Sequence, residues 1–179
     1  MADTTSIVGT VNQTYFNQML TADGVTDRIR DAQICICSNF SSLSVPVGAT
    51  IDGIEILMKG SAADANHDTA VGDWIYVSND GGSSFSTAQS ITTGPWSTSV
   101  ASLQLELAGG TSELWGESWN ATTAAAIQVK FAWSTSGGDA VFFDYVSVRI
   151  TYTVVAADAL PKSLTINSVV TINGQLIIK

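Results

Sequence analysis

Four stretches of this chain alternate apolar and polar residues with a period of two, and none sustains the apolar period of 3.6 residues that marks a helix. They lie at 51–59, 103–107, 127–133 and 146–154. A strand with this pattern places its apolar face on a core and its polar face outward. We therefore expect these side chains to be buried: Ile54, Ile56, Leu103, Leu105, Val129, Phe131, Val146, Val148 and Ile150. On the same reasoning Glu106 faces outward.

Clusters of Gly, Pro, Asn, Asp and Ser separate these stretches, so a strand is expected about every 10 to 20 residues. This spacing predicts an all-β fold, an antiparallel β-sandwich or jelly roll with a C-terminal β arm. One short helical turn is expected within 119–126. We assign residues 1–156 to the β-sandwich domain and residues 157–179 to a linker and arm for self-association or partner association.

The C-terminal stretch is apolar and repetitive: after Pro161 comes SLTINSVVTINGQLIIK, in which TIN recurs after six residues. In an extended strand, one face would carry Leu164, Ile166, Val170, Ile172, Leu176 and Ile178. Such a strand must be covered, so we expect it to pair with itself, a neighbouring copy or another protein. A final hairpin packed on its own domain is the alternative.

The charge balance narrows the range of partners. Seven basic and sixteen acidic residues give a net charge of −9, which argues against a basic nucleic-acid-binding surface. No apolar run is long enough to span a membrane, and the first residues lack the pattern of a signal peptide. We therefore expect neither a nucleic-acid nor a membrane partner.

Cys35 and Cys37 lie two residues apart in QICIC, on one face of an expected strand, and we predict that both are reduced and buried. The only histidine is His67, in a polar loop with Asp64, Asn66 and Asp68. That loop resembles the first half of a calcium loop but lacks its glycine and its final glutamate. We expect a solvated loop, no metal site and no cofactor.

Residues 78–85, SNDGGSSF, match the Asp-box pattern Ser/Thr-x-Asp-x-Gly-x-Ser/Thr-aromatic. Asp80 is expected to accept hydrogen bonds from backbone amides in the turn, and Gly82 to allow a positive φ. Phe85 is expected to pin the hairpin to the core. We interpret Ser78, Asp80, Gly82 and Phe85 as a structural turn, not as a site of chemistry.

Five tryptophans raise the alternative of sugar binding, for which Trp96 and Trp74 are the stacking candidates. Trp115 and Trp119 are expected to clamp a long loop. Asp144 falls on an expected core face, so it must be bonded, and we expect it to hold loop amides, with Trp115–Gly116 as the candidate.

Catalysis finds little support in the sequence. The acids Glu106, Glu113 and Glu117 are nominal candidates for a glycosidase pair, but no base, nucleophile and oxyanion donors come together. We expect a protein that is not an enzyme.

Four segments, taken in order, resemble a known family. They are SVPVGATIDGIEILMKG at 44–60, VSNDGGSSFSTAQ at 77–89, LAGGTSELWGESW at 107–119 and FFDYVSVRITYT at 142–153. Together they resemble a β-sandwich domain of tailed-phage virion proteins and bacterial surface proteins. The resemblance covers about residues 40–154. The chain departs from the family pattern at Phe85, where Trp is frequent, and at Ser112–Leu114, where Asp often precedes Trp-Gly.

The resemblance implies a fold and a setting, since the family brings no agreed catalytic set. It implies a non-enzymatic virion protein, made in the host cytoplasm, and specifically a capsid decoration or cement protein that stabilises the head. Its partners would be the major capsid protein and its own copies, with a trimer as the implied assembly. The alternatives are a tail or baseplate component, and a carbohydrate-binding adhesin module of a fibre or cell surface.

Overall fold

The computed structural model describes residues 2–8, 10–11, 24, 26–30, 34–40, 43–62, 74–91, 97, 99, 101–132, 140–154, 169–172 and 175–178. Its elements are β1 (Ala2–Val8), β2 (Thr10–Val11), β3 (Asp27–Arg30), β4 (Ile34–Ser38), β5 (Thr50–Ala62), β6 (Ile75–Ser78), β7 (Gln104–Gly110), α1 (Ala121–Ala125), β8 (Gln128–Ala132), β9 (Ala140–Thr153), β10 (Val169–Ile172) and β11 (Gln175–Ile178).

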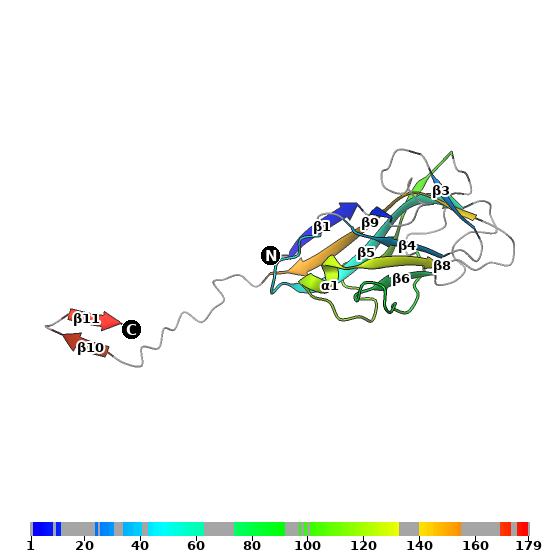
Figure 1. The fold of residues 1–179 in the computed structure, drawn as a ribbon. Coiled ribbons are helices and arrows are strands. Elements are labelled where there is room, and N and C mark those ends of the chain that lie inside the picture. The colour runs from blue at the N-terminus through cyan, green and yellow to red at the C-terminus, as the bar shows by residue number, and fades with distance from the viewer. Residues whose placement is uncertain are drawn as a thin grey trace.

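Two antiparallel sheets build the body of the molecule (Figure 1). The larger has the order β1-β9-β5-β7, and β3 pairs with β9 beyond the end of β1. The smaller has the order β2-β4-β8-β6. One apolar core draws on both sheets, and its aromatic rings bridge them, with the centroids of Phe131 in β8 and Phe143 in β9 4.9 Å apart. The predicted all-β sandwich is therefore confirmed.

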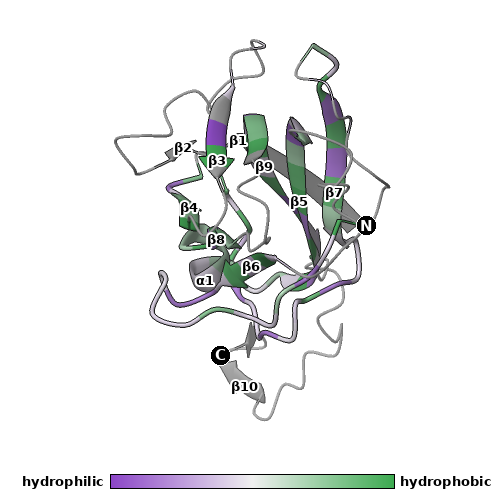
Figure 2. Ribbon diagram, turned by 90° about the vertical axis from the view of Figure 1, so that its right-hand side faces the viewer, coloured by the Kyte–Doolittle hydropathy of each residue, from purple (hydrophilic) through white to green (hydrophobic). Residues whose placement is uncertain are grey.

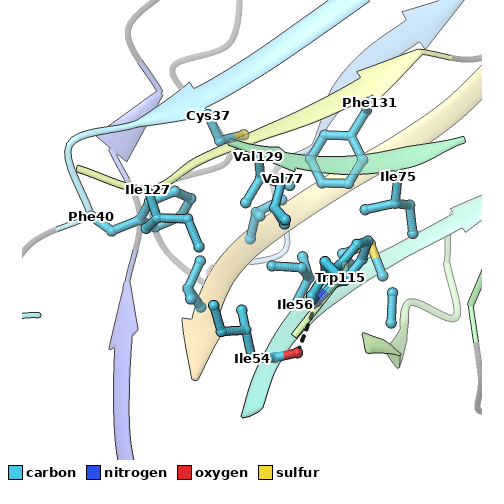
Figure 3. Packing of buried hydrophobic residues seen from close by; sticks show 14 of the residues in the cluster. Cys37, Phe40, Ile54, Ile56, Ile75, Val77, Trp115, Ile127, Val129 and Phe131 are labelled. Atoms are coloured by element: carbon cyan, nitrogen blue, oxygen red, sulfur yellow. Dashed lines mark hydrogen bonds between the residues drawn. The ribbon is translucent and has the colours of Figure 1, made fainter. Parts of the chain in front are cut away.

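Three of the four predicted core faces are confirmed. Ile54 and Ile56 in β5, Val129 and Phe131 in β8, and Val146, Val148 and Ile150 in β9 are all buried. Figure 3 shows residues of both sheets packed together in this cluster. Period-two alternation located these strands correctly because each has one face on the core.

The predicted face of β7 is wrong. Leu105 is 56% exposed and Leu103 is half-buried, whereas Glu106 and Ala108 are buried. The cause is the register with β5, which sets Glu106 opposite Met58 and Ala108 opposite Ile56. Directly opposite residues of an antiparallel pair share a face, so the inward side chains of β5 draw Glu106 inward and leave the leucines outside.

An irregularity at Asp144 reverses the alternation of β9. Along β5 the pairing passes from Lys59 opposite Tyr145 to Gly60 opposite Phe143, so Asp144 has no cross-strand partner. This extra residue shifts the buried positions from Phe143 before it to Val146 after it. Phe142, which strict alternation would place on the face of Val146, is therefore only half-buried.

The loop after β7 is fixed by its tryptophans, as predicted. Trp115, at φ 60°, inserts into the core and its Nε1 donates to the carbonyl oxygen of Ile54 at 3.0 Å (Figure 3). Trp119 Nε1 donates to the Leu114 carbonyl at 2.9 Å. The loop passes so close to β5 that a Cβ on Gly53 would lie 2.2 Å from the carbonyl carbon of Thr111.

The one helix of the described residues, α1, lies where a helical turn was predicted. Asn120 caps it: its Oδ1 accepts from the amides of Thr122 and Thr123, and the Thr123 hydroxyl accepts from the amide of Asn120. This reciprocal arrangement stabilises a helix too short to persist alone.

Near the C-terminus, β10 and β11 form an antiparallel hairpin, which we call the C-terminal hairpin. Its register sets Val170 opposite Ile177 and Thr171 opposite Leu176, so the single apolar face expected from Leu164 to Ile178 does not continue across the turn. Leu164 and Ile166 lie outside the described residues. The jelly-roll topology and the role of this segment as an arm stay predictions.

Candidate functional site

The turn at residues 78–85, which we call the Asp80 turn, is held together by its own polar side chains. Asp80 Oδ1 accepts from the Ser78 hydroxyl at 2.7 Å and from the Ser84 amide at 3.0 Å, and Oδ2 accepts from the Ser84 hydroxyl at 2.6 Å. The Ser78 hydroxyl in turn accepts from the Gly82 amide at 2.8 Å. Gly82 has the expected positive φ, 93°.

These hydrogen bonds favour the charged carboxylate, so the pKa of Asp80 lies well below its usual range, with the Ser84 hydroxyl as the largest cause. Both carboxylate oxygens are engaged within the turn. The geometry therefore matches the structural interpretation of Ser78, Asp80 and Gly82.

The expectation that Phe85 pins this turn to the core is wrong. Phe85 is only half-buried and lies on the outer surface of the smaller sheet, where the Lys130 ammonium is 4.3 Å from its ring centroid. The same ammonium is 3.9 Å from the ring centroid of Tyr76. Lys130 thus sits between two aromatic faces and joins the turn to β6 and β8 by cation–π attraction.

The neighbouring residue carries the buried contact instead. Ser86 is buried, its hydroxyl accepts from the Val77 amide at 3.0 Å, and its own amide donates to the Val77 carbonyl at 2.8 Å. The Asp-box pattern does not show which of Phe85 and Ser86 is buried, because the alternation of apolar and polar residues ends in the turn.

The hypothesis that Trp74 stacks on a sugar fails. Its side chain is 5% exposed and packs against Phe131 and Phe143, with ring centroids 5.7 and 6.2 Å away. A ring buried to this extent is not accessible to a sugar. Trp96 lies outside the described residues.

Asp144 is buried and bonded, as predicted, but not by the predicted loop. Its Oδ1 accepts from the Gly24 amide at 2.9 Å, and its Oδ2 lies 2.7 Å from the Lys59 ammonium. β3 pairs with β9 as far as Phe143, and β1 pairs with β9 from Ser147 onward, so Asp144 lies between the two paired stretches. Its carboxylate bonds there to Gly24, which precedes β3. The amides of Trp115–Gly116 are not its partners. These contacts give Asp144 a structural role at the irregularity in β9.

A second ion pair on the outer face of the larger sheet was not anticipated. Arg149 Nε and Nη2 donate to the two carboxylate oxygens of Glu55 at 2.6 and 2.7 Å, across the β5–β9 pair. This bidentate contact raises the pKa of Arg149. In the sequence, Glu55 and Arg149 are polar positions within two alternating stretches. Only the register of β5 with β9 shows that these two positions are opposite each other.

The two cysteines are buried free thiols on one face of β4, as predicted. The pKa of Cys37 is raised well above its usual range, first by its hydrogen bond with Cys35 and then by burial. A thiol held in its neutral form is a poor nucleophile and a poor metal ligand.

Within the described ranges, no three His, Cys, Asp or Glu side chains gather in a group that could hold a metal ion. Of the acids named as candidates for a glycosidase pair, Glu106 is buried in the sandwich. The Glu113 carboxylate accepts a hydrogen bond from the Trp115 amide at 2.6 Å. Both side chains are therefore part of the packing and hydrogen bonding of the fold. The loop with His67, Asp64, Asn66 and Asp68 lies outside the described residues.

Comparisons with protein-family models, with curated proteins and with solved structures give no match. Among the described residues, no helix is long and apolar enough to cross a membrane. Each of the polar clusters described in this subsection stabilises a turn or a pair of strands. Among the described residues, four large apolar side chains are exposed: Ile34, Val47, Leu105 and Val154.

Proposed function

We propose that this chain is a non-enzymatic structural protein of a tailed-phage virion, and specifically a head decoration or cement protein. The observation that carries the proposal is the order and spacing of the four segments at 44–60, 77–89, 107–119 and 142–153. They resemble a β-sandwich domain of virion proteins over most of the chain.

The positions of these segments in the fold support that resemblance. The first and last segments form β5 and β9, which pair along most of their length in the middle of the larger sheet. The second forms β6 and the Asp80 turn, and the third forms the end of β7 and the loop of Trp115. The resemblance thus falls on residues that build the sandwich.

The chemistry of the same segments supports a non-enzymatic role. Both carboxylate oxygens of Asp80 and of Asp144 are engaged by nearby amides, hydroxyls or an ammonium group, and one oxygen of Glu113 accepts from the Trp115 amide. A carboxylate that holds a turn or an ion pair is occupied in the folded state. The proposed activity is therefore binding, to the major capsid protein and to further copies of this chain in the virion.

The test is to locate the chain in particles of the phage that encodes it, by cryo-electron microscopy at a resolution that traces strands. We expect density for the sandwich on the outside of the head. We also expect heads without the chain to release DNA at a lower temperature than complete heads, and purified chain to restore the difference.

Density on the tail or baseplate would refute head decoration in favour of a tail component. A glycan-array signal that Trp96→Ala abolishes, with no density on the head, would favour the adhesin alternative. Particles that lack the chain altogether would refute the virion role.

A further inference from the structure

The outer face of the β5–β7 pair carries a row of leucines: Leu57 in β5, Leu103 just before β7, and Leu105 and Leu107 within it. We call this set the leucine row. Leu105 is 56% exposed, the other three are half-buried, and none belongs to the buried core cluster. β7 forms one side of the larger sheet, at the right of Figure 2. The row is therefore an apolar strip near one margin of the sandwich.

This strip results from the unusual phase of β7. The inward positions hold Glu106 and Ala108, while the long apolar side chains point away from the core. A strand with one solvated face ordinarily has the opposite arrangement. A row of leucines on the outer face provides a surface on which an apolar segment can pack.

The C-terminal hairpin is a segment of the matching kind. Among the strand pairings of the described residues, β10 and β11 pair with each other and with neither sheet of the sandwich (Figure 1). A two-stranded hairpin is at best marginally stable alone in water, and it gains stability by packing against another surface. Its sequence supplies apolar residues in both strands, VVTI and QLII.

Charge also favours this pairing. The linker and arm, residues 157–179, contain two lysines and one acidic residue, a side-chain charge of +1. The other 156 residues contain five basic and fifteen acidic side chains, a net charge of −10. The hairpin segment is therefore attracted to the body of this protein, and this long-range attraction weakens as salt rises.

We propose that the C-terminal hairpin of one copy packs over the leucine row of a second copy. The inference rests on the proposed function in one respect, namely that further copies of this chain are among its partners. It assigns the receptor surface within that partner, which neither the sequence pattern nor the resemblance specifies.

The test is photo-crosslinking of the full-length chain, in solution and without phage heads. Chain carrying p-benzoyl-phenylalanine in place of Ile172 is mixed with an equal amount of unmodified chain labelled with ¹⁵N, irradiated and digested. We expect mass spectrometry to find products that join the light hairpin to heavy peptides at residues 103–107. Products confined to one light chain, products that map elsewhere, or no heavy–light product at any protein concentration would overturn the inference.

A matched pair of variants tests the surface itself. Leu105→Lys in the heavy chain should lower the yield of the heavy–light product at least tenfold. Ile34→Lys should leave the yield unchanged, because Ile34 is equally exposed, at 57%, but lies on β4 in the other sheet. Equal losses in both variants would overturn the inference. Unchanged urea midpoints of the two variants establish that both are folded.

This outcome is separable from the test on virions. Chain that decorates heads but gives no cross-link at the leucine row refutes only the present inference. Chain that gives the cross-link but is absent from heads refutes only the proposed function.

Discussion

Replacing Phe131 by alanine should remove a large part of the stability of the sandwich. The side chain is fully buried in β8, its ring centroid is 4.9 Å from that of Phe143, and it is 5.7 Å from that of Trp74. Truncation of a buried Phe costs about 3–5 kcal/mol, because transfer free energy is lost and a cavity remains. The upper half of that range applies here, since two aromatic contacts of about 0.5–1.5 kcal/mol each are lost as well.

The assay is urea unfolding followed by tryptophan fluorescence, with the slope m compared between variants. At an m of roughly 2 kcal/mol per molar urea, the expected loss lowers the midpoint by about 2–2.5 M. Leu105→Ala is the control, because the sequence pattern placed both side chains in the core whereas the structure exposes Leu105. Its effect should stay within about 0.5 kcal/mol, the usual range for a surface position. A loss below about 1 kcal/mol for Phe131→Ala, or equal losses for the two variants, would refute the assigned core faces.

Three further predictions concern single positions. Gly53→Ala should destabilise the sandwich by at least about 1–3 kcal/mol in the same urea assay, because its Cβ would overlap the backbone of the loop after β7; a neutral result would contradict that close approach. The hydrogen bonds of the charged Asp80 carboxylate stabilise the fold above its unfolded pKa of about 4, and this contribution is lost as pH falls through the lowered folded pKa. The thermal midpoint of Asp80→Asn should therefore approach that of the wild type as pH falls from 5 to 2. A difference that stays constant with pH would count against this role of Asp80. Cys35 and Cys37 should react slowly with a thiol reagent in the native chain and rapidly in urea; fast native labelling would show that they are not buried.

The alternating pattern determined much of the larger architecture. In β8, in β5 from Ile54 to Met58 and in β9 from Val146 to Tyr152, the residues at every second position meet the core. Local polarity and burial agree there, so these strands are visible in the sequence alone. Helix content and its position were also local properties, because the sequence around Asn120 contains its own capping groups. The Asp80 turn closes through hydrogen bonds between residues at most four apart, which is why its pattern sufficed.

Two features depended on contacts between distant segments. The phase of β7 follows from its register on β5, and the spacing of Leu103, Leu105 and Leu107 carries no information about which neighbour it will have. The role of Asp144 depends on Lys59 and Gly24, 85 and 120 residues away in the chain.

Alternation within a strand shows which residues share a face, but not which face meets the core. That choice belongs to cross-strand pairing, where a shift of one residue exchanges every inward side chain for an outward one. The sequence by itself therefore determined that this chain forms amphipathic strands and a self-contained turn. Only the tertiary structure decided that β7 turns its leucines away from the core, because only there are Met58 and Ile56 set opposite Glu106 and Ala108.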